Sequence, residues 1–278
     1  MKHEPGIPAI TSGFQKGGNG GDLFKGAASY YSEYRRAYPA PVLSYITEEF
    51  QLDGAGRLLD AGCGTGQVSQ GLAPYFEEAI AIDRDPEMVS FARKNFFNLG
   101  LSNVVVHQLP VEAIDESFGM FRIAAFGASF HWMDRVAVGN RVYDRLQPGG
   151  SIVVLSPGGF HSGITTWEAV IQDLVTEWVG VERRAGDGIY QEGERHEQAL
   201  RRTHFGSSST KDIVVQEDWS IDQIIGYLFS TSYASRAVLR DRAGGFENAV
   251  RQNLLQLRPD GQFQKSVEYS VISATRRH

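Results

Sequence analysis

Short apolar runs alternate with stretches of helical spacing through the middle of the chain. The runs that predict strands lie at 57–61, 79–83, 104–107, 121–128 and 151–156. Helical spacing lies between them at 68–76, 86–99 and 137–146. Strands that alternate with helices form a parallel sheet covered on both faces. This region therefore predicts an α/β, Rossmann-like, doubly wound fold.

The two flanks of this region follow other patterns. Residues 27–50 read as two helices that Pro39 and Pro41 separate, because proline cannot continue a helix. After residue 157 the alternation stops. Further helices are predicted at 167–179, 221–239 and 246–257, and further strands at 212–216 and 267–274. We expect a mostly parallel, seven-stranded sheet with a helical lid insertion after the fifth strand, over the edge where such sheets bind ligands.

These patterns divide the chain into four parts. We expect a flexible N-terminal segment at 1–26, a ligand-binding core at 27–159, the helical lid insertion at 160–210, and late strands and helices that complete the core at 211–278. The first part holds seven glycines and few large apolar residues, so ordering it costs much entropy. An alternative is that this segment folds over a ligand or over a neighbouring subunit.

Composition and charge narrow the class of protein. The 278 residues are 42% hydrophobic and carry a net charge of −6, which is typical of a globular protein and argues against a nucleic-acid partner. The single cysteine, Cys63, excludes an intramolecular disulfide, and no cluster has metal-ligand spacing. No apolar run reaches the roughly 18 residues of a membrane span, and the start lacks a secretory signal pattern. We expect a cytoplasmic protein with a small-molecule partner; homo-oligomerisation stays open.

The sharpest motif is a glycine loop after the first predicted strand, LLDAGCGTG at 58–66. Its glycines stand at alternate positions, 62, 64 and 66, where they permit a tight turn and close approach of a ligand. Dinucleotide-binding loops follow G-x-G-x-x-G, but Gln67 occupies the third glycine position of that pattern. Asp60 precedes the loop, and its carboxylate suits a cation better than a pyrophosphate. An NAD-binding oxidoreductase is therefore the weaker alternative.

Asp83 ends the second predicted strand, 21 residues after Gly62. A carboxylate at this place can accept hydrogen bonds from ribose hydroxyls. The alternative role, capping the next helix, suits Asp85 better because Pro86 follows it at the first helical position.

Taken together, the motifs resemble the class I S-adenosylmethionine (SAM)-dependent methyltransferases. They are LLDAGCGTG at 58–66, AIDRDPEM at 81–88, FHWMD at 130–134 and LQPGG at 146–150. The FHW element and the Y-x-x-Y-R-x-x-Y-P element at 31–39 look most like the small-molecule branch that includes trans-aconitate methyltransferases. The resemblance implies SAM as cofactor and methyl transfer to an oxygen or carbon of a small molecule, as in biosynthetic tailoring. Some of the aromatic residues of the insertion and the late helices, such as Trp219 and Tyr227, should line the acceptor pocket, which suggests an apolar or aromatic acceptor.

The resemblance also implies roles for individual residues. Those that it places around the cofactor are Tyr31, Arg35, Asp60, Gly62, Cys63, Gly64, Asp83, Arg84, Met88, Val111, Glu112 and Ser129. The glycine loop would lie under the methionine part of SAM, with the Asp60 carboxylate facing the ammonium. Tyr31 and Arg35 would close over the same end of the cofactor.

The adenosine end is expected at the next two strands. Asp83 would hold the ribose, with Arg84 and Met88 near the adenosine. Pro110 stands where the family usually has an acidic residue beside alanine. The adenine amine would then rely on backbone groups after Pro110 or on Glu112.

The chemistry of methyl transfer leaves the catalytic residues open. The reaction is an in-line displacement, so alignment and exclusion of water matter most, and a base is needed only if the acceptor loses a proton. His131, His161 and Tyr31 are the candidates, although each could instead be structural. An alkene acceptor would need no base, because aromatic faces can stabilise a cation. A further alternative is a SAM-binding protein with a non-methylating or regulatory role.

Overall fold

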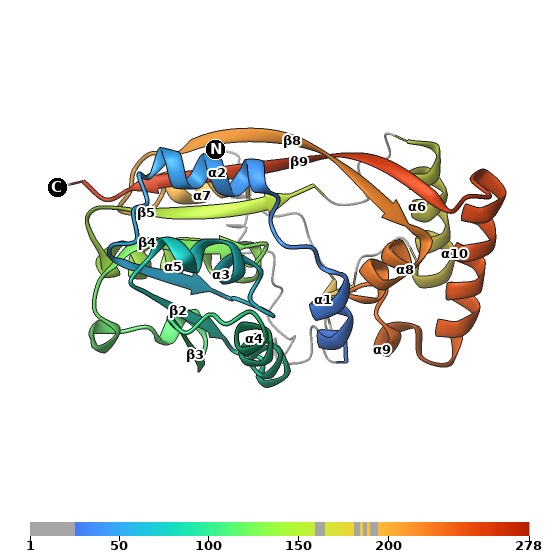
Figure 1. Ribbon diagram of the computed structural model, residues 1–278, viewed down its shortest axis with the longest axis horizontal. Coiled ribbons are helices and arrows are strands. Elements are labelled where there is room, and N and C mark those ends of the chain that lie inside the picture. The colour runs from blue at the N-terminus through green and yellow to red at the C-terminus, as the bar shows by residue number, and fades with distance from the viewer. Residues whose placement is uncertain (1–25, 159–164, 181–183, 186–187, 190–193, 278) are drawn as a thin grey trace, which may run out of the picture.

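A seven-stranded sheet forms one half of the molecule, and two of its strands extend towards the other end (Figure 1). The computed structural model describes residues 26–158, 165–180, 184–185, 188–189 and 194–277. The strands, in their order across the sheet, are β3 (Val104–Gln108), β2 (Glu78–Asp83), β1 (Arg57–Ala61), β4 (Phe121–Gly127), β5 (Leu146–Pro157), β9 (Gln262–Thr275) and β8 (Ser209–Ser220). The first five are parallel, and β9 pairs antiparallel with both β5 and β8. The predicted α/β class and mostly parallel sheet are confirmed.

Helices cover both faces of the parallel part of the sheet. They are α2 (Ala40–Glu49), α3 (Gln67–Leu72), α4 (Pro86–Asn98) and α5 (Arg135–Arg145). Leu58 of β1 packs in the cluster that includes α2 and α3, whereas its neighbour Leu59 packs in the cluster that includes α5. Because both faces are buried, these strands carry continuous apolar runs instead of an alternating pattern.

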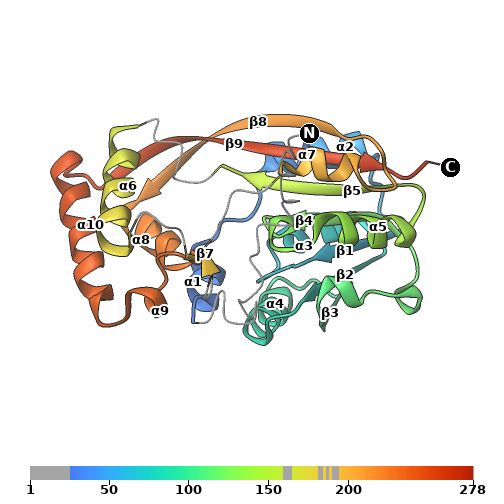
Figure 2. The same cartoon turned by 180° about the vertical axis from the view of Figure 1, so that it is seen from behind.

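A second group of helices forms its own core at one end of the sheet. Its members are α6 (Thr166–Val179), α8 (Ile221–Phe229), α9 (Arg236–Leu239) and α10 (Ala243–Leu257). Trp167, Phe229 and Phe246 are buried at the centre of this core. The hairpin of β8 and β9 extends beyond the parallel strands and carries these helices at its far end (Figure 2).

The structure divides the second half of the chain differently from the predicted lid insertion at 160–210. The helix α6 packs against α10, so it belongs to the same helical core as residues of 211–278. The helix α7 (His196–Arg201) instead packs against α5, and Leu200 joins the core beneath the sheet. The spacing of residues along the chain could not predict these two packing partners, because α6 with α10 and α7 with α5 are contacts between segments far apart in sequence.

The predicted helix at 221–239 is two helices in the structure. Hydroxyl groups satisfy the last carbonyls of α8: Ser230 Oγ donates to the oxygen of Tyr227, and Thr231 Oγ1 donates to that of Leu228. These side-chain bonds replace the backbone bonds that would continue the helix. The chain re-enters a helix at α9, where Ser235 is the N-cap.

The helix α1 (Ala28–Tyr34) lies between the helical core and the sheet, where it contacts α8 and α4 (Figure 1). Together with α2 it confirms the two helices predicted over 27–50. Of the segment predicted to be flexible, 1–26, only Gly26 is among the described residues. Within the described parts of the chain, no helix has the length and apolar character needed to cross a membrane.

Candidate functional site

Two cavities meet at the carboxyl ends of β1, β2 and β4. The first, of about 810 Å³, is the glycine-loop cavity, lined by Tyr31, Gly62, Gly64, Asp83, Arg84, Asp85, Met88, Pro110, Val111, Glu112, Gly127, Ala128, Ser129, Trp132 and Met133. The second, of about 720 Å³, is the aromatic cavity, whose larger lining side chains are Tyr31, Arg35, Arg36, Tyr38, Glu217, Trp219, Tyr227, Lys265 and Tyr269. Tyr31, Gly127 and Ala128 line both cavities and form the strip between them. Nine of the twelve residues predicted to contact a cofactor thus line one cavity.

Local backbone geometry explains why the loop after β1 needs its glycines. Gly62 has a φ of +67°, and a Cβ there would lie 2.8 Å from Ser129 Cβ. Gly66 has a φ of +97°, and a Cβ would lie 2.4 Å from Phe96 Cε1. Side chains rarely adopt this left-handed conformation and here also have no room. The turn therefore presents bare backbone to the glycine-loop cavity.

Asp83 is fixed by two backbone amides at the end of β2. Its Oδ2 accepts from the N–H of Gly64 at 2.8 Å, and its Oδ1 accepts from the N–H of Asp85 at 2.9 Å. Burial raises the pKa of this carboxyl, and the two amide hydrogen bonds oppose the rise. Asp85 caps α4 by accepting from the N–H groups of Glu87 and Met88, as predicted. Asp83 therefore keeps its remaining acceptor positions for the cavity.

The Asp60 carboxylate lies behind the glycine loop, against α3, and its contact with a ligand stays a prediction. It is fully buried and lines neither cavity. Its Oδ2 accepts from both the N–H and the hydroxyl of Ser69, at 3.0 and 2.7 Å, which anchors the first turn of α3. Its Oδ1 has no hydrogen-bond partner among the described residues. Burial raises the pKa of Asp60 to about 6.

Arg35 lies in the aromatic cavity between two tyrosine rings. Its guanidinium carbon is 4.9 Å from the ring centre of Tyr31 and 4.2 Å from that of Tyr227. Its Nε donates to Ser230 Oγ at 2.8 Å and its Nη1 to Tyr227 Oη at 3.2 Å. No carboxylate of the described residues pairs with this cation. Cys63 also lines this cavity, on the opposite side of the loop from Gly62 and Gly64.

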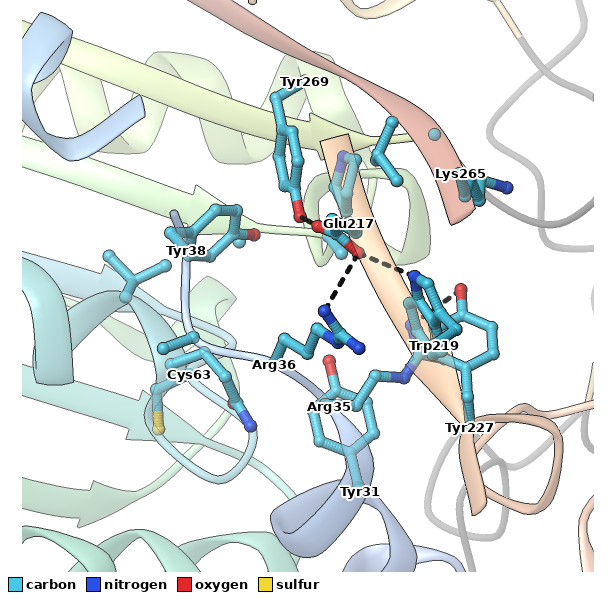
Figure 3. Close-up of a pocket in the computed structure, with 18 residues that line it drawn as sticks. Tyr31, Arg35, Arg36, Tyr38, Cys63, Glu217, Trp219, Tyr227, Lys265 and Tyr269 are labelled. Atoms are coloured by element: carbon cyan, nitrogen blue, oxygen red, sulfur yellow. Dashed lines mark hydrogen bonds and ion pairs between the residues drawn. The ribbon is translucent and has the colours of Figure 1, made fainter. Parts of the chain in front are cut away.

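Sequence reasoning missed the residues that the late hairpin adds to the aromatic cavity. They are Glu217 of β8 and Lys265 and Tyr269 of β9, which lie beside Trp219, an aromatic residue expected to line the pocket (Figure 3). The predicted apolar or aromatic lining is aromatic, but it also contains charged groups. The sequence did contain one signal for Glu217. Residues two apart in a strand point to the same face, so Glu217 lies on the face of β8 that carries the buried Trp219.

The structure separates the three catalytic candidates. His131, in η4 (Phe130–Trp132), lines neither cavity; burial, together with nearby His196, lowers its pKa to about 3. Such an imidazole stays neutral and is a weak base. Tyr31 does line both cavities, but burial raises its pKa, so the phenol stays protonated. His161 lies outside the described residues.

Comparison with known proteins agrees with this geometry. Residues 58–150 match the family described as methyltransferase domain. This stretch is therefore similar to a methyltransferase domain. An uncharacterised methyltransferase-like protein of Schizosaccharomyces pombe is 32% identical over 130 residues, 46% of this chain and 49% of that protein. A ubiquinone biosynthesis O-methyltransferase of Xylella fastidiosa is 32% identical over 117 residues, 40% of this chain and 46% of that protein. The chain thus spans about half the length of the curated relatives that it matches.

Solved structures share the fold of the methyltransferase domain and of the rest of the chain. The crystal structure of the [4+2]-cyclase SpnF has a TM-score of 0.54 and 19% identity, and the alignment covers 99% of each chain. At this identity the likeness concerns the fold alone. The similarity implies SAM as the cofactor, and the glycine-loop cavity fits it: Asp83 and Glu112 offer acceptors for hydroxyl and amine groups, and the bare loop backbone leaves room for the ligand.

Proposed function

We propose that this protein transfers a methyl group from SAM to an oxygen or carbon of a small organic molecule. The observation that carries the proposal is the meeting of two cavities at Tyr31, Gly127 and Ala128. A methyltransferase domain supplies one cavity, and residues outside that domain supply most of the other. Direct transfer of a group between two bound molecules requires two adjacent binding sites, and these two cavities share lining residues.

The residues of the glycine-loop cavity would hold the cofactor. The Asp83 carboxylate, fixed by two amides, would accept from the ribose hydroxyls. The Glu112 carboxylate and the backbone of Val111 would contact the adenine, because Pro110 offers no side-chain donor or acceptor. Bound there, SAM supplies a methyl group that its sulfonium has already activated.

The methionine end would face the aromatic cavity. Arg35 has no carboxylate partner among the described residues, so its guanidinium suits the carboxylate of the cofactor. The stacked rings of Tyr31 and Tyr227 hold it in place. The resemblance to the family suggested this role for Arg35, and its position in the structure supports it.

Gly127 would keep the passage between the two sites open. A Cβ at this position would lie 2.5 Å from Val68 Cγ2 and 2.9 Å from Tyr38 Oη. Any side chain would therefore push these groups into the strip where the methyl group passes. The buried walls around the strip also exclude water, which favours transfer to the bound acceptor.

A small acceptor agrees with the size and aromatic lining of the second cavity. One relative is named as an O-methyltransferase of ubiquinone biosynthesis, which agrees with an oxygen acceptor and a role in biosynthetic tailoring. We place the protein in the small-molecule branch that the FHW element at 130–132 suggested, acting on a cytoplasmic metabolite.

Calorimetric titration with SAM and with S-adenosylhomocysteine tests the proposal. We expect both to bind. Loss of binding in Asp83→Ala, with retention in the control Asp173→Asn on the exposed side of α6, would place the cofactor in the predicted cavity. If neither compound binds to the wild-type protein, the proposal is wrong. If both bind but methyl-tritiated SAM labels none of a broad panel of acceptors, the result would favour the alternative of a SAM-binding protein that does not methylate.

A further inference from the structure

A hydrogen-bonded carboxylate, that of Glu217, lies between Tyr269 and Trp219 in the aromatic cavity (Figure 3). Glu217 is 8% exposed. Its Oε1 accepts from Tyr269 Oη at 2.6 Å, and its Oε2 accepts from Trp219 Nε1 at 3.0 Å. Arg36 Nη1 lies 3.7 Å from Oε2. A buried carboxyl group is costly without such partners, and these three side chains supply them.

The contact with Glu217 fixes the direction of the Tyr269 hydroxyl. The phenolic proton points at Glu217 Oε1, so the lone pairs of Tyr269 Oη are left to accept a hydrogen bond. Burial, and the neighbouring carboxylate, raise the pKa of Tyr269, so the phenol keeps its proton in the resting protein. The Tyr269 oxygen can thus accept a hydrogen bond from a ligand in the cavity, while the Glu217 carboxylate behind it can accept the Tyr269 proton.

Tyr38 presents the complementary donor. It is 9% exposed, and its hydroxyl makes no hydrogen bond to any residue that the structure describes. The hydroxyl lies beside the strip between the cavities, because a Cβ on Gly127 would be 2.9 Å from it. Its ring packs edge-on against that of Tyr269, with ring centres 6.2 Å apart. The Tyr38 hydroxyl lines the aromatic cavity and can donate to an oxygen of a ligand there.

We propose that the methyl acceptor is a small aromatic molecule with a hydroxyl group, which Tyr38 and Tyr269 hold and whose proton leaves through Tyr269 to Glu217. This inference rests on the proposed methyl transfer. It narrows the reaction to oxygen methylation and assigns the proton acceptor that the sequence had sought among His131, His161 and Tyr31.

The transfer step balances with these groups alone. The acceptor oxygen forms a bond to the methyl carbon while the bond from that carbon to sulfur breaks, and the electron pair of the broken bond stays on sulfur. The hydroxyl proton passes to Tyr269 Oη as the proton of Tyr269 passes to Glu217 Oε1. The products are a methyl ether, S-adenosylhomocysteine and a protonated Glu217, which later loses its proton to solvent.

Two other charged side chains that line the cavity, Lys265 and Arg36, already form ion pairs. Lys265 Nζ forms an ion pair with Glu168 Oε1 at 2.5 Å, and both side chains are buried. Arg36 contacts Glu217 and donates to Gln223. Among the described residues that line this cavity, Glu217 is the acidic one, which leaves it as the place where a proton can go.

Naphthol and its methyl ether, methoxynaphthalene, test the proposal on protein saturated with S-adenosylhomocysteine. The ether has the same rings but no proton to give. We expect naphthol to bind at least about tenfold more tightly than the ether, which corresponds to about 1.4 kcal/mol. Excited naphthol is a strong acid, so bound naphthol next to a proton acceptor is expected to emit as naphtholate.

Three variants separate the roles. Tyr38→Phe is expected to weaken the binding of naphthol and of the ether alike, because both oxygens can accept from Tyr38, and to keep naphtholate emission. Tyr269→Phe is expected to lose the preference for naphthol, because only naphthol donates to Tyr269. Glu217→Gln and Tyr269→Phe are expected to lose naphtholate emission at saturating naphthol, which loss of packing alone would not cause. Tyr45→Phe, on α2 and outside both cavities, is the control and should behave as wild type.

The outcomes also distinguish this inference from the proposed function. Equal binding of naphthol and ether, failure of naphthol to bind, or naphtholate emission that survives Glu217→Gln would overturn the inference. In each case, binding of S-adenosylhomocysteine would leave the proposed methyl transfer standing. If S-adenosylhomocysteine itself does not bind, the proposed function fails first.

Discussion

The ionisation of Asp60 should be measurable in the stability of the cofactor-free protein. The group is fully buried, and only its Oδ2 is hydrogen bonded to described residues. Burial raises its pKa from 3.8 to about 6, which makes the ionised form less favourable in the folded state by about 3 kcal/mol. The perturbation that isolates this effect is Asp60→Asn, which keeps an oxygen to accept from Ser69 but cannot ionise.

The sign follows from proton binding in the two states. Because the folded pKa of Asp60 lies above the unfolded value, the folded state holds a proton that the unfolded state releases between about pH 4 and pH 6. The stabilisation is complete below about pH 4 and is lost as the pH rises through about 6. Relative to Asp60→Asn, the wild-type protein should therefore lose about 2.4 kcal/mol of unfolding free energy between pH 4 and pH 7.

Urea unfolding of both proteins at a series of pH values provides the assay. The difference in unfolding free energy between them is the quantity to compare, because groups elsewhere titrate equally in both. A difference in unfolding free energy that is the same at every pH reflects the replacement of the carboxyl group by the asparagine amide. Asp173→Asn, which removes an exposed carboxylate from α6, controls for the change in net charge. A difference that does not change with pH would refute the reasoning that Asp60 is buried without a charged partner.

The same titration with saturating SAM tests the role that the sequence predicted for Asp60. If the ammonium of the cofactor reaches Oδ1, the ionised form gains a partner and the loss of stability with pH becomes smaller. If the pH dependence is unchanged, Asp60 serves only to anchor α3 through Ser69.

Three other substitutions have defined outcomes. Asp83→Ala should weaken SAM binding by more than about tenfold in calorimetry, because a charged acceptor is lost; unchanged affinity would mean that the ribose lies elsewhere. Gly62→Ala should lower the unfolding free energy by about 2 kcal/mol or more, since its φ is +67° and its Cβ would meet Ser129; wild-type stability in urea would contradict this. Lys265→Met should cost about 3–5 kcal/mol in the same assay, because it leaves Glu168 buried without its cation, whereas adding Glu168→Leu should restore most of that loss. A double variant no more stable than Lys265→Met would show that the pair itself was net stabilising.

Local patterns were sufficient for the parallel half of the fold. Strand β1 has the predicted bounds, and α4 begins at Pro86 behind its Asp85 cap as expected. The glycine loop and Asp83 were also found in advance and do line one cavity. Each of these features depends on a few neighbouring residues, such as a left-handed glycine or a proline after a cap, so its signal is local.

Long-range packing decided the features that the sequence could not give. The residues of β1 alternate between two faces, and this pleat places the Asp60 carboxylate against α3 instead of the cavity. The hairpin of β8 and β9 brings Glu217 and Tyr269 to the aromatic cavity from positions 52 residues apart.

The sequence by itself determined the class of fold, the methyltransferase signature and nine of the residues that line the glycine-loop cavity, because these lie on one continuous strand–loop–helix pattern. Only the tertiary structure decided what lines the aromatic cavity. That wall is assembled from α1, β8 and β9, whose mutual positions depend on how the second helical core packs at the end of the sheet. The burial of His131 is decided in the same way, by α7 packing against the element after β4.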